Sequence, residues 1–355
     1  MNFTQEVISW YHLHKRDLPW RKTRDPYLIW LSEVILQQTR VDQGMPYYYR
    51  FSEKYPTVAD FAAATEDEIL KMWQGLGYYS RGRNMHHTAG LVMRTHGGIF
   101  PGSYQALIGL KGIGEYTAAA ISSFAENEKR AVVDGNVFRV LSRYFNIDTP
   151  INSTAGKKTF TRLANELIDP RYPALYNQAI MEFGALQCRP KPECPTCPLR
   201  PGCLAYQLGK TADLPVKDKK KASRQRYFNY IVAQRDGRML MNKRGPGDIW
   251  QNMYELPLIE TNALTSPADL LISPEFTQAF GTQAVVGNVY GPVKHVLTHQ
   301  NIAATFIILS GFEEFFLNNS GWIYVDPESL DKLAMPKLIF AFLKNYPEIQ
   351  FNLTN

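Results

Sequence analysis

The sequence of 355 residues lacks any apolar run that approaches the roughly 18 residues needed to span a bilayer. Its longest candidate, segment 302–312, is interrupted by Thr, Ser and Gly. The first 20 residues mix Glu, His, Lys and Arg without an apolar centre, which excludes a secretory signal peptide. We therefore expect a soluble, cytoplasmic protein with no membrane partner.

Excess charge is also scarce outside one segment. The formal net charge of +6 comes from 39 basic and 33 acidic residues, and segment 217–226, with six basic residues and one acid, supplies five of these six charges. The remaining chain is nearly neutral. Bulk charge therefore does not establish nucleic-acid binding, and such a function has to rest on local motifs.

Strand-like alternation is almost absent from residues 1–208, which predicts a helical domain. One helix opens with Asp25 as its N-cap and Pro26 in its first turn, and continues to Ile35. Apolar residues at helical spacing predict four further helices, at 66–73, 116–124, 137–145 and 177–186.

The pattern changes after residue 208. Segment 209–226 is polar and basic, and it is predicted to be a linker. Residues 227–234 are rich in β-formers and are followed by Asp236-Gly237 and RMLMNKR, which predicts a hairpin. Residues 227–355 are therefore expected to form a separate α+β domain. Its other predicted elements are strands at 285–290 and 302–309 and a helix at 326–346.

Cysteine occurs only four times, with the spacing C-x5-C-x2-C-x5-C: Cys188, Cys194, Cys197 and Cys203. Such clustering favours a shared metal centre, because disulfides are rare in cytosolic proteins. Zinc and an iron–sulfur cubane both accept four thiolates, and the spacing alone leaves both open.

Residues 107–119 read LIGLKGIGEYTAA and predict a tight turn between two helices. Gly112 and Gly114 flank an isoleucine, and glycine tolerates positive φ and close backbone approach. The free amides at the start of the second helix can then hold a DNA phosphate. This segment, about 104–124, resembles the hairpin of helix–hairpin–helix DNA glycosylases.

The resemblance extends to a wider set of motifs. A helix–hairpin–helix, an aspartate soon after it and a four-cysteine loop follow in this order in the endonuclease III superfamily. The segments WLSEVILQQT (30–39), GLGYYSRGRN (75–84) and VDGNV (133–137) resemble the MutY-type adenine DNA glycosylases. The motif matches span most of residues 16–203, and weaker similarity continues through the C-terminal domain.

This resemblance implies a multidomain, mostly α-helical glycosylase domain at 1–208, with an iron–sulfur loop at 188–203, followed by an α+β Nudix-like domain at 227–355. It implies a 4Fe–4S cluster held by the four cysteines, although this chain has five residues between the first two cysteines where the family commonly has six. It also implies a monomer in the cytoplasm, associated with the nucleoid, whose partner is double-stranded DNA with A:8-oxoguanine or A:G mispairs.

The implied activity is monofunctional hydrolysis of the N-glycosidic bond of the mispaired adenine. Bifunctional relatives carry a lysine two residues after the second hairpin glycine, whereas this chain has Tyr116, whose phenol forms no Schiff base. Two alternatives remain open. One is a bifunctional endonuclease III-like pyrimidine glycosylase and lyase, and the other is a non-catalytic, cluster-bearing DNA-binding protein.

Two carboxylates are the implied catalytic groups, and their sequence surroundings differ. Glu33 lies amid apolar residues of a helix, so we expect burial to raise its pKa and keep it protonated as the acid for adenine N7. Asp134 precedes a helix whose terminal amides favour an ionised carboxylate, which would stabilise the cationic sugar. The resemblance implies that Asn136 orients Asp134 or a water, and that Tyr116 positions the sugar.

The remaining implied contacts fall into two groups. The pocket for the extruded adenine would be lined by Arg16, Trp20, Arg21, Leu36 and Gln178. The opposite base would be read by Gln38, Tyr78, Leu297, Thr298 and His299. The last three replace the family's Phe-Ser-His loop, so a hydroxyl and an imidazole are retained and the aromatic ring is lost. The C-terminal domain lacks the Nudix box, and no hydrolysis of nucleoside diphosphates is expected of it.

Overall fold

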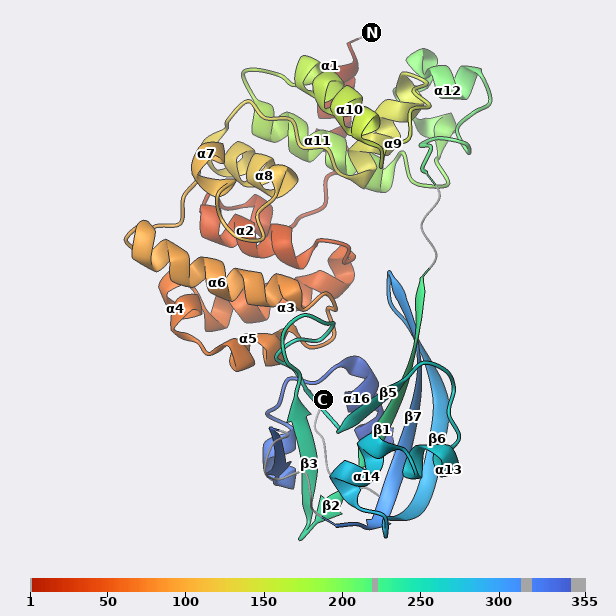
Figure 1. Ribbon diagram of the computed structural model, residues 1–355. Helices are drawn as coiled ribbons and strands as arrows, with labels where there is room; N and C mark the ends of the chain where they lie inside the picture. The colour runs from red at the N-terminus through yellow and green to blue at the C-terminus, as the bar shows by residue number, and fades with distance from the viewer. Residues whose placement is uncertain (1, 219–222, 314–320, 346–355) are drawn as a thin grey trace. The chain divides into compact units, whose positions relative to one another are not determined.

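The computed structural model describes residues 2–218, 223–313 and 321–345 (Figure 1). The chain divides into two compact units, the first made of 1–64 and 84–220 and the second of 65–83 and 221–355. Residues 219–222 of the basic segment and Tyr346 at the end of the last predicted helix lie outside the described residues. No helix in the described part of the chain is long and apolar enough to cross a membrane.

The first unit is built from helices. They are α1 (Phe3–His14), α2 (Pro26–Ile35), α3 (Val41–Lys54), α4 (Val58–Ala63), α6 (Ser80–Thr95), α7 (Tyr104–Leu107), α8 (Glu115–Glu126), α9 (Gly135–Tyr144), α10 (Thr154–Leu167), α11 (Pro173–Leu186) and α12 (Leu204–Gln207). Short 3-10 helices occur at Pro19–Arg21, Cys194–Thr196 and Arg200–Gly202. The first four residues of α6 belong to the second unit.

Helix α2 is buried around most of its circumference, as expected of a helix that is apolar on nearly every face. Its start matches the prediction: the Asp25 side chain accepts a hydrogen bond from the Tyr27 amide, and Pro26 occupies the first turn. A second core joins α1, α9, α10 and α11 around Leu141 and Phe183. The four other predicted helices are also confirmed, with ends that differ for α8, α9 and α11.

The second unit contains two four-stranded sheets. The larger has the order β5-β1-β7-β6, with β1 (Arg224–Val232) parallel to β7 (Gln300–Gly311) and antiparallel to β5 (Leu258–Thr261). Its edge strands are β5 and β6 (Val285–Val296), and β6 is antiparallel to β7. The smaller sheet comprises β2 (Gln234–Arg235), β3 (Arg238–Lys243), β4 (Tyr254–Glu255) and β8 (Trp322–Val325). The helices of this unit are α5 (Glu66–Trp73), α13 (Pro267–Leu271), α14 (Pro274–Phe280), α15 (Pro327–Leu330) and α16 (Lys337–Asn345).

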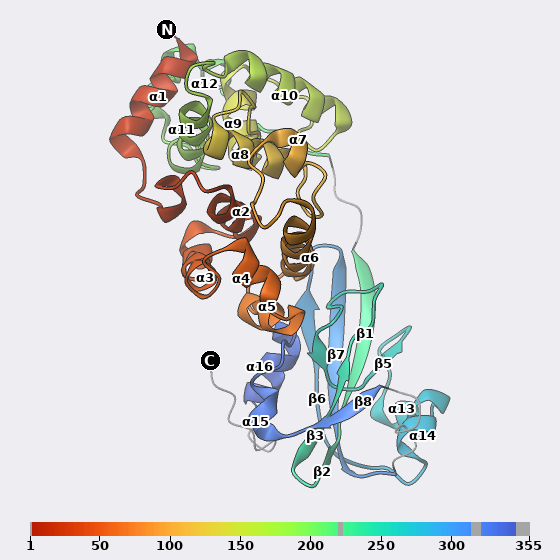
Figure 2. The ribbon, with the colours of Figure 1, turned by 90° about the vertical axis from the view of Figure 1, so that its left-hand side faces the viewer.

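Side-chain alternation along the strands gives the larger sheet two apolar faces. Phe306 on β7 stacks on Phe342 of α16 with ring centroids 3.8 Å apart, and Figure 2 shows α16 beside this sheet. The next residue, Ile307, points to the other face and packs in a cluster with Phe276 and Phe280 of α14. The strands predicted at 285–290 and 302–309 are thus confirmed and are longer than predicted.

Three predictions for the C-terminal half need correction. The Asp236-Gly237 turn has positive φ at both residues, but it joins β3 to the two-residue β2, because the long strand β1 pairs in the other sheet. The predicted helix 326–346 is two helices, α15 and α16, with Pro336 directly before the second. Strand β1 begins within the predicted linker, at Arg224.

The earlier part of the predicted linker is also bonded to the first unit. The Ile151 amide donates to the Val216 carbonyl at 3.0 Å, and the Asp218 amide donates to the Asn152 side chain at 2.8 Å. Polar composition predicted a solvated tether here, but backbone hydrogen bonds need no apolar pattern and so are not visible in the composition.

Candidate active site

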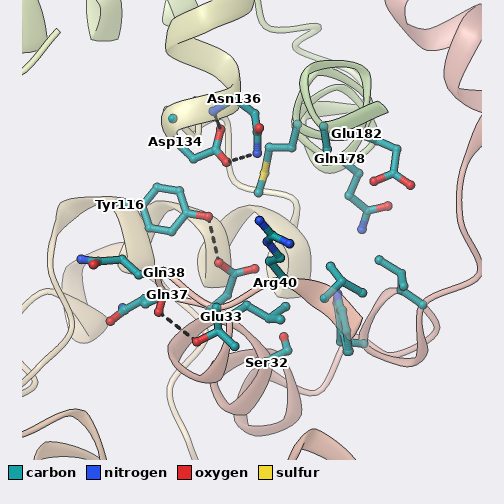
Figure 3. A pocket seen from close by; sticks show the side chains of 18 of the residues that line it. Ser32, Glu33, Gln37, Gln38, Arg40, Tyr116, Asp134, Asn136, Gln178 and Glu182 are labelled. Carbon is teal, nitrogen blue, oxygen red and sulfur yellow. Dashed lines mark hydrogen bonds between the residues drawn. The ribbon is translucent and has the colours of Figure 1, made fainter. Parts of the chain in front are cut away.

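A cavity of about 870 Å³ lies in the first unit, bordered by α2, α8, α9, α11 and the turn after α2 (Figure 3). Its volume is within the range of small-molecule sites. The residues that line it include ten of those singled out from the sequence: Arg16, Trp20, Arg21, Glu33, Leu36, Gln38, Tyr116, Asp134, Asn136 and Gln178. The fold therefore brings together residues that are more than 160 positions apart in the chain.

Glu33 is a buried carboxyl in the last half of α2, with 9% of its surface exposed. Burial raises the pKa of Glu33 to about 7. The hydroxyl of Tyr116 donates to Glu33 Oε2 at 3.1 Å, which opposes the rise, and the nearby Asp134 charge adds to it. The pKa of Glu33 is thus raised in the direction that the sequence predicted, and part of the carboxyl is protonated near pH 7.

Asp134 has a different environment as the N-cap of α9. Its Oδ1 accepts from the backbone amides of Asn136 and Val137, both at 2.8 Å, and its Oδ2 accepts from the Asn136 side chain at 2.7 Å. Burial raises the pKa of Asp134, and these hydrogen bonds oppose the rise. The expectation that the helix amides would set this pKa is corrected, because burial outweighs them.

The two carboxyls nevertheless differ in how readily they ionise. Asp134 accepts three hydrogen bonds, which favour its charged form, whereas Glu33 accepts one among the described residues. Burial also raises the pKa of Tyr116 far above that of a free phenol, so this hydroxyl remains a hydrogen-bond donor. The hydrogen bonds therefore favour the proton on Glu33 and the negative charge on Asp134.

Arg139 of α9 stabilises the position of Asn136, the partner of Asp134, although the sequence analysis did not single it out. Its guanidinium donates to Asn136 Oδ1 at 2.8 Å and to the carbonyls of Cys188 and Gly184, each at 2.7 Å. A Cβ at Gly184 would lie 2.7 Å from the Asn136 Cβ, so glycine is required for α11 to approach α9 this closely. Arg139 therefore links the Asp134 region to the cysteine loop.

Glu182 is a second group that the sequence analysis missed. Its side chain is 1% exposed and accepts from Arg16 Nη2 at 2.7 Å and from Arg21 Nη2 at 2.8 Å. Burial alone would raise the pKa of Glu182, but the hydrogen bonds from the two arginines prevail and lower it to about 2. Glu182 follows Gln178 by four residues, so both side chains lie on one face of α11. This spacing is the sequence pattern that could have pointed to Glu182.

Arg40 also lines the cavity, and Figure 3 shows it among the catalytic candidates. Within the described parts of the chain, its side chain forms no hydrogen bond or ion pair, in contrast to Arg16 and Arg21. An exposed guanidinium at the edge of a cavity is suited to an anionic group of a bound molecule.

The predicted hairpin lies between α7 and α8. Gly112 has a φ of +81°, and a Cβ there would lie 2.8 Å from the Asn84 Cβ, so both the conformation and the contact require glycine. Gly114 is the N-cap of α8 with a φ of −89° and no atom near its missing Cβ. The positive φ and close approach that glycine allows are therefore used at Gly112 and not at Gly114.

The four cysteines line one small cavity at the end of the first unit: Cys188, Cys194, Cys197 and Cys203. All are free thiols and half-buried. Arg143 is 3% exposed and donates to Cys188 Sγ at 3.4 Å and to two carbonyls of the loop. No three His, Cys, Asp or Glu side chains of the described residues surround a single ion position. Four thiols are a donor set that both a structural zinc ion and an iron–sulfur cubane accept.

The residues predicted to read an opposite base fall in both units. Gln38 lines the cavity of the first unit and has a φ of +56°. In the second unit, Leu297, Thr298 and His299 form the turn between β6 and β7, with Thr298 and His299 exposed and Leu297 half-buried. The hydroxyls of Tyr78 and Thr298, both of the second unit, are hydrogen-bonded to each other.

Comparison with known proteins first gives the class. The HhH-GPD superfamily of base excision DNA repair proteins matches residues 31–169, and a NUDIX domain matches residues 229–345. The solved structure of a thermostable thymine-DNA glycosylase is 32% identical, covers 58% of this chain and 95% of its own, and superposes with a TM-score of 0.54. The first unit therefore has the helix–hairpin–helix glycosylase fold, followed by a Nudix-like domain, which confirms the predicted fold class.

The full-length comparison gives the particular family. The adenine DNA glycosylase of Buchnera aphidicola subsp. Baizongia pistaciae is 33% identical over 341 residues, which cover 94% of this chain and 93% of the relative. The adenine DNA glycosylase of Mus musculus is 43% identical over 215 residues, which cover 58% of this chain and 42% of the relative. The chain belongs to the adenine DNA glycosylase family, as the motifs predicted.

Proposed function

We propose that this protein removes adenine mispaired with 8-oxoguanine or guanine from double-stranded DNA in base-excision repair. The observation that carries the proposal is the pair of carboxyls in one cavity: Glu33, with a pKa of about 7, and Asp134, with three hydrogen-bond donors. Hydrolysis of a glycosidic bond requires an acid for the leaving group and a negative charge beside the oxocarbenium-like sugar.

The reaction follows from these two environments. The adenine leaves the base stack and enters the cavity, since its glycosidic bond is otherwise unreachable. Glu33 donates its proton to N7, the bond between C1′ and N9 breaks, and adenine leaves with the bonding electrons. The Asp134 carboxylate stabilises the cationic sugar, and water then adds to C1′ and releases a proton. Asn136 keeps Asp134 in place through the 2.7 Å hydrogen bond.

The proposed reaction stops at the abasic site. Strand cleavage by β-elimination begins with an amine that attacks C1′. Among the described residues that line the cavity there is no lysine, and Tyr116 occupies the position of the lyase lysine with its hydroxyl bonded to Glu33. This argues against the bifunctional alternative, and the two carboxyls in one cavity argue against a purely DNA-binding protein.

The partner is DNA, which the hairpin at Gly112 is suited to hold by its phosphate backbone. The turn of Leu297, Thr298 and His299 would read the opposite base, and Tyr78 would hold Thr298 through their shared hydrogen bond. We further propose that the protein acts as a monomer at the nucleoid.

A 4Fe–4S cluster is proposed for the four-cysteine cavity. Cys188, Cys194, Cys197 and Cys203 would hold it, and it would supply a rigid scaffold for the loop. Arg143 fixes the same loop from inside the protein through the Arg189 and Pro190 carbonyls. The similarity of the chain to the adenine DNA glycosylase family favours the cubane over zinc.

One experiment tests the proposed function against both alternatives. A duplex with one adenine opposite 8-oxoguanine is incubated with the protein, and the strands are analysed with and without alkali. The expected result is strand breakage only after alkali, together with free adenine. Breakage without alkali would indicate a lyase, and no adenine release would contradict the proposal. Glu33→Gln is the matched control, which is expected to abolish release.

A further inference from the structure

A buried tyrosine lies behind the residues that line the cavity, and the proposed reaction does not use it. Tyr11 of α1 is 3% exposed and does not line the cavity, but its hydroxyl donates to Gln178 Oε1 at 2.9 Å. We infer that Tyr11 is a positioning residue that sets base specificity, because it fixes which end of the Gln178 amide faces the extruded base. This inference rests on the proposed adenine glycosylase function.

The position of the Tyr11 hydroxyl is fixed by packing. Helices α1 and α11 lie against each other, and the rings of Trp10 and Phe183 meet edge to face with centroids 4.9 Å apart. Gln178 lies on the neighbouring face of α11 and lines the cavity. A buried tyrosine hydroxyl needs a hydrogen-bond partner, and Gln178 supplies it.

The protonated state of Tyr11 makes its hydroxyl the donor in this hydrogen bond. Burial raises the pKa of Tyr11, the nearby Arg21 charge opposes the rise, and the Glu182 charge adds to it. The phenol therefore keeps its proton, which it donates to the carbonyl oxygen of Gln178.

The amide of Gln178 is thereby oriented. With Oε1 bound to Tyr11, the Nε2 group is turned toward the cavity, as Figure 3 shows. Gln178 therefore offers the base a hydrogen-bond donor. If Tyr11 accepted a hydrogen bond instead, the amide would present its oxygen to the base and would prefer the opposite pattern.

This polarity distinguishes 6-aminopurines from 6-oxopurines. A purine that receives a proton at N7 from Glu33 directs its pyrimidine ring away from α2, and Gln178 is contributed by α11 on another wall. Adenine carries an acceptor at N1, whereas hypoxanthine and guanine carry an N1–H donor. A donor from Gln178 pairs with adenine N1 and faces a second donor in the oxopurines, which leaves both groups unpaired.

The test compares adenine with hypoxanthine, each opposite 8-oxoguanine, in single-turnover assays. Tyr11→Phe removes the hydroxyl and frees the amide to rotate. We expect the adenine rate to fall about three- to tenfold, as for one lost hydrogen bond, and the adenine-to-hypoxanthine ratio to fall with it. Tyr176→Phe is the matched control. Tyr176 is a buried tyrosine of α11, the helix that carries Gln178, and its hydroxyl has no partner among the described residues.

Two results would overturn the inference. One is an unchanged ratio in Tyr11→Phe, even if both rates fall, since damage to packing lowers both rates alike. The other is a Tyr11→Phe effect that persists in a Gln178→Ala background or with 1-deazaadenine, which has no N1 acceptor. If the unmodified protein releases no adenine at all, the proposed function fails, and this outcome is distinct from a normal rate with no coupling between Tyr11 and Gln178.

Discussion

The hydroxyl of Tyr116 and the carboxyl of Glu33 form a hydrogen bond of 3.1 Å between α8 and α2. This contact favours the ionised form of Glu33, against the burial that raises its pKa to about 7. Glu33 therefore loses the proton that the proposed reaction needs at a pH close to neutral.

The rate should consequently depend on pH with a defined sign. The reactive form of Glu33 is protonated, so we expect the single-turnover rate to fall as pH rises through about 7. Tyr116→Phe removes a hydrogen bond that lowers the pKa of Glu33, so the falling limb should move to higher pH. Rates measured between about pH 5 and 9 test both statements. A limb at the same pH in both proteins would contradict the role of this hydrogen bond.

Glu33→Gln should increase stability while it abolishes activity. The buried carboxyl is protonated in the folded state up to about pH 7 but ionises near its ordinary pKa of 4.5 when unfolded. Its contribution to stability is fully present below the unfolded pKa and is lost as pH rises through the folded pKa. An amide does not ionise, so Glu33→Gln lacks this loss. The difference in unfolding free energy between the variant and the unmodified protein should therefore shift in favour of the variant by up to ~3 kcal/mol between pH 4 and pH 8. Thermal unfolding at both pH values checks the sign.

Arg139→Gln should impair the chemical step. The substitution removes the charged hydrogen bond to Asn136, which holds Asp134, and we expect the rate to fall about tenfold or more. Arg162→Gln is the control, because Arg162 is exposed on α10 and, among the described residues, its side chain forms only a 3.9 Å ion pair with Glu166. Equal rates in the two variants would show that the Arg139 link has no part in catalysis.

Thr298→Ala should weaken the preference for adenine opposite 8-oxoguanine over adenine opposite guanine. The loss of the hydroxyl removes the hydrogen-bond partner of Tyr78, and we expect the preference to fall about fivefold. Thr265→Ala serves as the control, because within the described part of the chain the Thr265 hydroxyl donates a hydrogen bond only to the Ala263 carbonyl. A preference that stays constant in Thr298→Ala would place recognition of the opposite base elsewhere.

Metal analysis of the purified protein should find about four irons per chain and no zinc. Cys197→Ser should lower the iron content and the thermal stability, because Cys197 packs beside the core of α1, α9, α10 and α11. A single zinc per chain would contradict the proposed cluster.

The positions of Glu33 and Asp134 in their helices could be predicted from local motifs, and the family resemblance singled them out as catalytic candidates. Asp25-Pro26 marks the start of α2, and Asp134 the start of α9, through side-chain-to-amide bonds that span two or three residues. Local motifs of this kind do not depend on the rest of the fold.

The supporting partners Tyr11 and Glu182 were not accessible from the sequence, for the opposite reason. Tyr11 and Gln178 are 167 residues apart, and Arg16 and Glu182 are 166 apart. Each is an ordinary residue on an amphipathic helix until packing places its partner beside it. The pairing of β1 with β7 instead of β3 was missed likewise, because strand order depends on contacts across the whole domain.

The Asp134 side chain has two roles, since its oxygens face the cavity and also cap the N-terminus of α9. Asparagine retains an acceptor at this position and is an equally good helix cap, so a lineage that lost the repair reaction would keep its architecture. One substitution at this position would therefore remove the proposed glycosylase activity without misfolding. The inactive protein would keep its fold and its ability to bind DNA.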